Sequence, residues 1–221
     1  NFALDEGDVE LLLTYRHAEG RRRFDGVIVP AVTPAALAAL KRKGDKCRVF
    51  VNPALQELLD LDRAPRKRYV RGGFLVQPNY AFVIDLEDQE IEAVGNLEPQ
   101  QARDLTLAWA VGCTSNSNTI TLVRNGRLIG NGVGQQDRVT AAEVAVKRAR
   151  DAGHDVEGAV AYSDSFFPFP DGPLVLIEAG VKAILTSSGS INDVETRRVC
   201  ADHGVALRMV PDKKGRGYFG H

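Results

Sequence analysis

The segment SDSFFPFPD (163–171) holds the side chains best suited to bind a small molecule, because three phenylalanines and two prolines would form a rigid apolar wall. A flat heteroaromatic ring could pack against such a wall. The segment follows an expected strand, which is where α/β proteins place their ligands, and Asp164 could accept hydrogen bonds or bind a cation there. The alternative is that Phe166, Phe167 and Phe169 fill the core of a buried loop.

Two further loops carry small polar groups. TSNSN (114–118) lies between an expected helix and an expected strand, so its amides, hydroxyls and N–H groups could face a ligand. The alternative is a plain helix stop and turn, which Ser and Asn also favour. TSSGS (186–190) precedes a helix that Ser190 or Asn192 would cap, and its loop N–H groups would then be free for an anion.

A glycine-rich loop, GNGVGQQDR (130–138), opens another helix and could bind an anion through N–H groups and the helix dipole. Its glycines lack the spacing of a phosphate-binding P-loop or a dinucleotide fingerprint. Arg138 in the first turn opposes the dipole, so we expect an acidic partner for it, an anionic ligand being one candidate. A solvated arginine is the alternative.

The four histidines are His17, His154, His203 and His221, and no spacing among them predicts a zinc site. The zinc deaminase pattern of H-x-E with P-C-x-x-C is absent. Spacing alone identifies no histidine as a general base. The basic tail over 213–221 ends in aromatic residues and histidine, so it either docks or is a disordered end.

The composition describes a globular chain of 221 residues with 44% hydrophobic content, enough for one large domain or two small ones. The net charge of −1 does not favour nucleic-acid binding. Three separated cysteines do not form a disulfide framework, which favours a reducing cytoplasm. Neither a signal peptide nor a run of about 20 apolar residues is found. Because the chain begins with Asn1, the source polypeptide can be longer, processed or trimmed.

Strands alternate with helices along the chain, which predicts an α/β fold. Expected strands cover 26–30, 47–51, 69–78, 119–123, 128–129, 158–163, 182–186 and 205–209, and expected helices cover 97–111, 139–152, 174–179 and 192–203. A further helix would start at Thr33-Pro34. Asn125-Gly126 predicts a hairpin because both residues tolerate positive φ. We expect two subdomains, residues 1–95 and 96–221.

Eight segments occur in an order that resembles the aminoimidazole carboxamide ribotide (AICAR) transformylase domain of the bifunctional purine enzyme that also carries inosine monophosphate (IMP) cyclohydrolase. They are FDGVIVP (24–30), GGFLVQ (72–77), SN (117–118), NG (125–126), GQQDR (134–138), SDSFFPFPD (163–171), AGVKA (179–183) and FGH (219–221). The similarity runs over about residues 24–221, and SDSFFPFPD is its most specific part.

The resemblance implies cytidine-deaminase-like, three-layer α/β subdomains without zinc. It implies a transferase that moves a formyl group from 10-formyltetrahydrofolate to the amine of AICAR in de novo purine biosynthesis. The implied partners are AICAR and reduced folate, without nucleic acid or membrane. An intertwined cytoplasmic homodimer, with active sites at the subunit interface, is also implied.

The resemblance also assigns roles to individual residues. Asn118 matches the family's asparagine that contacts AICAR near the reacting amine, so the resemblance implies that Asn118 is the catalytic residue. The implied AICAR-binding residues are Phe166, Phe167, Pro168, Asp171 and Arg216, the last of which needs one extra residue before His221 to match. The implied folate-binding residues are Arg138, Gln77 and Phe166. Asp164 resembles a ligand of a monovalent cation such as K+.

One departure matters for catalysis. The family's transformylase domain is almost twice as long, and its first half carries a Lys-His pair whose histidine is the expected proton-transfer residue. This sequence lacks that pair, and Arg16-His17 does not stand in a matching context. The histidine would come from an N-terminal half, cleaved or encoded separately. Alternatives are a non-catalytic nucleotide or folate-binding module and a short enzyme that acts on a different amine. The missing metal ligands disfavour a deaminase-like hydrolase.

Overall fold

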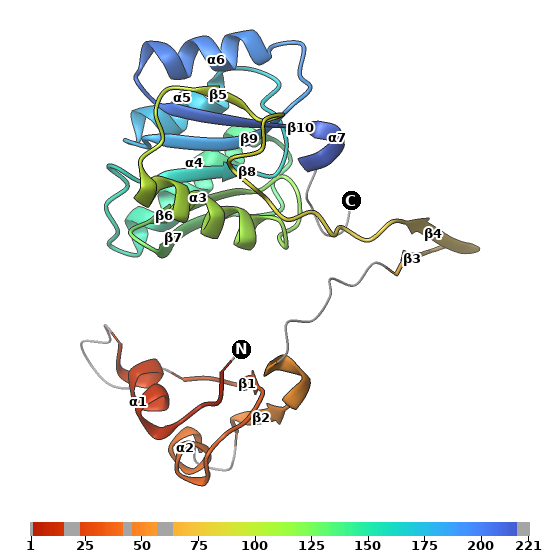
Figure 1. Cartoon of the computed structure of the whole chain (residues 1–221), viewed down its shortest axis with the longest axis vertical. Helices are drawn as coiled ribbons and strands as arrows, with labels where there is room; N and C mark the ends of the chain where they lie inside the picture. The colour runs from red at the N-terminus through yellow and green to blue at the C-terminus, as the bar shows by residue number, and fades with distance from the viewer. Residues whose placement is uncertain (1, 16–22, 42–45, 57–63, 216–221) are drawn as a thin grey trace. The chain divides into compact units, whose positions relative to one another are not determined.

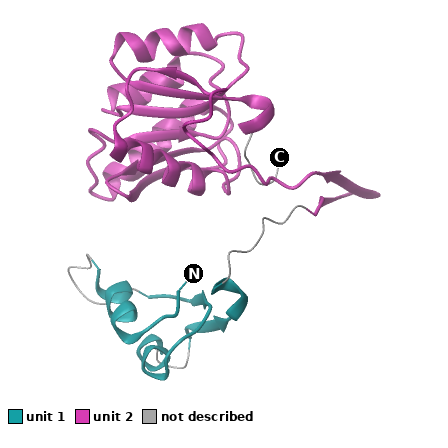
Figure 2. Ribbon diagram, viewed as in Figure 1, with its two compact units in different colours: residues 1–62 teal, residues 63–221 magenta. Residues whose placement is uncertain are grey.

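A computed structural model describes residues 2–15, 23–41, 46–56 and 64–215. The chain forms two compact units, residues 1–62 and 63–221, which are coloured separately in Figure 2. This division lies earlier than the expected one near residue 95. The reason is that Phe82, Ile84 and Leu86 pack in a core of the second unit. Strand β5 (Glu92–Val94) also belongs to the sheet of that unit, where it pairs with β10 (Ala206–Pro211).

The first unit is a small β-α-β arrangement. It contains α1 (Glu6–Thr14), β1 (Gly26–Val29), α2 (Pro34–Leu40), β2 (Arg48–Val51) and the short 3-10 helix η1 (Pro53–Gln56). The two strands are parallel. Thr33 caps α2 by accepting a hydrogen bond from Ala36 N at 3.1 Å, and Pro34 takes the first helical position. Helix α1 was not expected from the sequence, and it begins with a reciprocal capping box between Asp5 and Asp8.

The second unit is built on a six-stranded mixed sheet in the order β5-β10-β9-β8-β6-β7 (Figure 1). Its other strands are β6 (Ile120–Arg124), β7 (Arg127–Gly132), β8 (Val160–Ser163) and β9 (Ala183–Ser188). Strands β8, β9 and β10 are parallel, whereas β6 runs antiparallel to both β7 and β8. The predicted hairpin joins β6 to β7, with Asn125 and Gly126 both at positive φ.

Helices cover both faces of this sheet, which confirms the expected three-layer α/β architecture. α3 (Pro99–Gly112) packs on one face, and α4 (Arg138–Asp151), α5 (Asp171–Glu178) and α6 (Asp193–Asp202) pack on the other. Alternate strand residues serve the two cores, since Ile184 faces α4 to α6 and Leu185 faces α3. A short helix, α7 (Asp212–Gly215), follows β10. Among the described residues, no helix combines the length and the apolar character of a membrane span.

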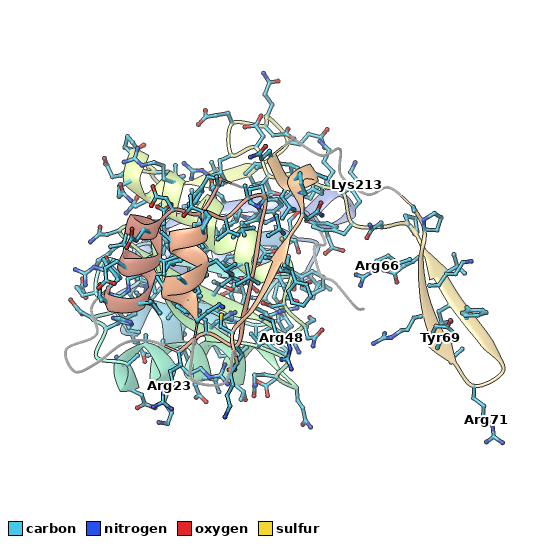
Figure 3. All side chains as sticks on the ribbon, turned by 90° about the horizontal axis from the view of Figure 1, so that it is seen from below. Arg23, Arg48, Arg66, Tyr69, Arg71 and Lys213 are labelled. Atoms are coloured by element: carbon cyan, nitrogen blue, oxygen red, sulfur yellow. The ribbon has the colours of Figure 1, made fainter. Side chains whose placement is uncertain are left out.

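The expected single strand over 69–78 is instead a hairpin of β3 (Arg66–Val70) and β4 (Gly73–Gln77). Gly72 reverses the chain at φ +87, a conformation that suits glycine. The hairpin is exposed on both faces. Tyr69 is 82% exposed, and Figure 3 shows it standing out from the ribbon together with Arg71 at the turn.

Candidate functional site

The polar and aromatic loops meet at one edge of the six-stranded sheet. Ile120, the first residue of β6, pairs both with Ser163 at the end of β8 and with Gly132 at the end of β7. The loop before β6 therefore lies beside the loops that follow β7 and β8. The loop after β9 lies at the same edge, because β8 and β9 are parallel. This edge brings together four of the segments that the sequence analysis singled out.

Asn118 is fixed by the loop that follows β7. Its Nδ2 donates to the Gln135 carbonyl at 2.9 Å, and the two backbones exchange hydrogen bonds of 3.2 Å and 3.1 Å. Gly134 N also donates to the Asn116 carbonyl. The amide NH2 of Asn118 is thus engaged, whereas its Oδ1 has no partner among the described residues. Asn118 can offer this acceptor oxygen to a ligand.

Asp164 and Arg138 form a buried ion pair behind these loops. Arg138 Nη1 donates to Asp164 Oδ1 at 2.7 Å, with side-chain exposures of 10% and 0%. The same oxygen accepts Thr119 N at 2.9 Å, and Arg138 Nε donates to the Phe166 carbonyl at 2.7 Å. The acidic partner that the sequence predicted for Arg138 is therefore present within the chain. Asp164 Oδ2 is buried without a hydrogen-bond partner.

The three phenylalanines of the loop after β8 have different surroundings. Phe167 is 1% exposed and belongs to the core, where a Cβ at Gly172 would lie 2.7 Å from its ring. Phe169 is 59% exposed. Phe166 is half-buried, and its ring lies near Gly189, whose Cβ would be 3.7 Å from it. The buried-loop alternative thus applies to Phe167, while Phe166 and Phe169 keep part of their ring surface exposed.

The anion site expected in the loop after β9 is not formed, because the chain itself satisfies its N–H groups. Gly189 N and Ser190 N donate to the two carboxylate oxygens of Asp193 at 2.7 Å and 3.3 Å. Asn192 does not cap α6 with its side chain but donates to the Pro168 carbonyl at 2.6 Å. This bond ties the loop to the phenylalanine segment.

The start of α4 is likewise capped from within. Asp137 Oδ1 accepts Thr140 N at 2.7 Å, so a carboxylate already occupies the position that an anion would take at this helix. Backbone hydrogen bonding by Thr140 lowers the pKa of Asp137. The glycine-rich loop therefore acts here as a partner of Asn116 and Asn118 rather than as a bare phosphate cradle.

Two tyrosines with buried hydroxyl groups near the site were not singled out from the sequence. Burial raises the pKa of Tyr162 well above its usual value and raises that of Tyr80 to about 12. Tyr162 lies two residues before Asp164 and its hydroxyl has no partner. Neither phenol is suited to exchange a proton near neutral pH. Only the apolar strand pattern around Tyr162 hinted at its burial.

Of the remaining predicted residues, Pro168 and Asp171 belong to the same segment as Phe166, whereas Gln77 does not. Asp171 begins α5 and is exposed, and Pro168 is exposed in the loop before it. Gln77 ends β4 on the exposed hairpin. Arg216 lies outside the described residues. Among the described residues, no group of three or more His, Cys, Asp or Glu side chains could hold a metal ion.

Comparison with known proteins gives matches along most of the chain. The profile of the AICARFT/IMPCHase bienzyme family matches residues 15–148. The bifunctional purine biosynthesis protein PurH of Acidithiobacillus ferrooxidans is 39% identical over 188 residues, which is 82% of this chain and 34% of that protein. PurH of Mycobacterium marinum is 36% identical over 207 residues, 88% of this chain and 35% of that protein.

The chain thus spans about a third of the length of these relatives. Among solved structures, the dCMP deaminase of cyanophage S-TIM5 is similar at 16% identity, with a TM-score of 0.34 over 50% of this chain and 98% of that one.

Proposed function

Since the chain belongs to the AICARFT/IMPCHase bienzyme family, we propose that it forms the C-terminal half of an AICAR transformylase domain and serves purine biosynthesis. The proposed reaction moves a formyl group from 10-formyltetrahydrofolate to the 5-amino group of AICAR. One observation supports this most directly: the Asn118 loop and the Phe166 loop lie side by side, joined through Asp164 and Arg138.

The 5-amino group of AICAR is a weak nucleophile, because its lone pair is delocalised into the ring. A bond forms between this nitrogen and the formyl carbon, and the bond from that carbon to N10 of the folate breaks. A base takes the proton from the amine, and an acid protonates N10. Much of the acceleration in such a reaction comes from holding both flat substrates in a reactive orientation.

The residues at the sheet edge fit this task. Asn118 would orient the amine through its free Oδ1, because its NH2 group is held by Gln135. Phe166, Phe169 and Pro168 would wall the two ring systems. Arg138 would reach a folate only through Nη2, since Nη1 and Nε are engaged.

Three assignments remain proposals from the family resemblance. Arg216 would bind the nucleotide phosphate, Gln77 would contact the folate, and Asp171 would contact AICAR. Phe167 would support the wall from beneath, because it is buried in the core.

A monovalent cation at Asp164 has a limited fit. One carboxylate oxygen is buried and unpartnered, which suits a cation. The other already pairs with a guanidinium, so much of the carboxylate's charge is compensated. No step of the reaction is therefore assigned to a cation.

The proton-transfer group would come from outside this chain's described site. Of the described histidines, His203 is the C-cap of α6, where its Nδ1 contacts the Val199 carbonyl, and His154 follows α4. Neither position belongs to the four loops at the sheet edge. We propose that a segment equivalent to the unmatched part of the relatives supplies this group, either within a longer polypeptide or as a separate chain. A homodimer is the second proposed assembly.

The first test titrates the 221-residue protein with AICAR and with reduced folate, and follows binding by thermal shift. The second is a formyl-transfer assay, run with and without the N-terminal half of a PurH transformylase domain. We expect AICAR binding by the chain alone and turnover only after the N-terminal half is added. Phe166→Ala should abolish most binding, whereas Leu128→Ala, on an exposed position of β7, should not. Binding without turnover in either mixture would favour a non-catalytic module, and absence of AICAR binding would refute the proposal.

A further inference from the structure

We propose that the Asp164–Arg138 ion pair is a clamp that sets the position of Asn118 relative to Phe166. Both members are then positioning residues, which act on AICAR through their neighbours. This inference rests on the proposed function for its ligand, but its structural part stands on the contacts alone.

The clamp joins loops that are distant in the sequence. Asp164 Oδ1 holds Thr119 N, the backbone group next to Asn118, and a second bond runs from Asp164 N to the Thr119 carbonyl at 3.2 Å. Arg138 holds the same oxygen through Nη1 and the Phe166 carbonyl through Nε, both at 2.7 Å. One guanidinium and one carboxylate thus connect the loop before β6, the start of α4 and the loop after β8.

Burial makes this connection rigid. The two side chains are 10% and 0% exposed, so water cannot replace either partner at low free energy. Removing one member of a buried pair leaves an uncompensated charge, which is strongly destabilising. The carboxylate and the guanidinium are therefore held together, and the loops that they contact follow them.

The geometry requires arginine rather than any cation. Nη1 and Nε belong to one planar fork, so they approach the carboxylate and the Phe166 carbonyl in fixed directions. A lysine ammonium on a flexible stem could pair with Asp164 without holding Phe166 in place. The positive charge of Arg138 is also largely compensated by Asp164 before any ligand binds. Its main contribution is thus to the distance between the amide of Asn118 and the ring of Phe166.

The experiment compares Arg138→Ala and Arg138→Lys with Arg150→Ala, an exposed arginine in the last turn of the same helix. AICAR affinity is measured by calorimetry, with and without added guanidinium at about 20 mM, well below denaturing concentrations. Hydrogen exchange is followed in residues 113–119 and 164–170. We expect Arg138→Ala to weaken AICAR binding about 10- to 100-fold, because Asn118 and Phe166 would then have to be ordered on binding, and ordering two side chains has a free-energy cost equivalent to about this factor.

Free guanidinium should restore part of that affinity, and Arg138→Lys should stay weak. Arg150→Ala should match the wild type in both readouts. Wild-type affinity in Arg138→Lys, or no rescue by guanidinium in a folded Arg138→Ala, would overturn the clamp. If Arg138→Ala does not fold, Asp164→Asn decides the matter, since it keeps the size and the Oδ1 acceptor but removes the charge. Faster exchange in both loops supports the clamp, and unchanged exchange overturns it.

Failure of the proposed function has a different signature. If the wild-type chain does not bind AICAR, that function is refuted, while the exchange rates still report on the clamp. If the wild type binds AICAR and the two loops exchange equally in Arg138→Ala and Arg150→Ala, the clamp alone is refuted.

Discussion

Replacing Gly132 with alanine should force α4 away from β7 and so disturb the start of α4, where Arg138 lies. A Cβ at Gly132 would stand 2.0 Å from the Ala141 carbonyl oxygen and 3.0 Å from Ala145 N. Both obstacles are helix backbone, so no side chain can rotate out of the way. Ordinary contact begins at 3.4 Å, which requires the strand and helix to separate by about 1.4 Å at this point.

The effect on stability follows from this overlap. Extra methyl groups in packed cores destabilise by about 1–3 kcal/mol, and an overlap with backbone places Gly132→Ala near the upper end, at about 3 kcal/mol. Urea unfolding of a domain this size has a slope of about 2–3 kcal/mol per molar, so the midpoint should fall by about 1 M. Trp109, the single tryptophan, reports on this transition by fluorescence because it lies in the second unit.

Gly73→Ala is the matched control. Nothing lies within 4 Å of a Cβ at Gly73, and its φ is not positive, so the change should stay within about 0.5 kcal/mol. An unaltered urea midpoint in Gly132→Ala would show that β7 and α4 are not in this close contact. The placement of Arg138 at the sheet edge would then lose its support.

Three other predictions concern single side chains. Asp104→Ala should destabilise the second unit by about 2–3 kcal/mol in the same urea assay. The reason is that the Asp104 carboxylate accepts hydrogen bonds from the backbone N–H groups of Asn125 and Gly126 in the β6–β7 turn, both at 2.7 Å. A change below about 0.5 kcal/mol would contradict this. Burial raises the pKa of Tyr80 from 10.0 to about 12, so the unfolded chain loses this proton at lower pH than the folded chain does. The stabilisation is therefore fully present below pH 10 and is lost as the pH rises through about 12. The free energy of unfolding should fall over that range, and it should fall less steeply in Tyr80→Phe. Burial raises the pKa of Cys200 to about 12, so iodoacetamide should alkylate the partly exposed Cys47 before Cys200. Equal alkylation rates of the two thiols, measured by mass spectrometry, would show that Cys200 is accessible.

The sequence predicted the regular elements of the second unit well where burial leaves a periodic pattern. The expected helix over 139–152 is α4 and the expected strand over 205–209 is β10, each within one or two residues. α4 carries apolar side chains at helical spacing because one of its faces lies in a core, whereas β10 is a short apolar run because both of its faces lie in a core. The Asn125-Gly126 turn could be predicted for a different reason, because the positive φ values of this turn favour asparagine and glycine.

The elements that were missed have no such pattern. β5 is a three-residue edge strand with two exposed residues, and only its pairing with β10 makes it a strand. β3 is basic and exposed, so no alternation marks it. The site could be predicted only in part. The unfavourable position of Arg138 at a helix start predicted an acidic partner, but the register of the sheet decides that this partner is Asp164, 26 residues away.

The direction of β6 explains why the site loops meet at all. The Asn118 loop precedes its strand and the Phe166 loop follows its strand, so in a wholly parallel sheet they would lie at opposite edges. Because β6 runs antiparallel to β8, its first residue stands beside Ser163, and the two loops come together. Asp104 of α3 holds the β6–β7 turn at the other end of β6 and so contributes to the register of β6 against β7. A change at the turn should therefore reach the site through strand register, although it lies at the other end of the sheet.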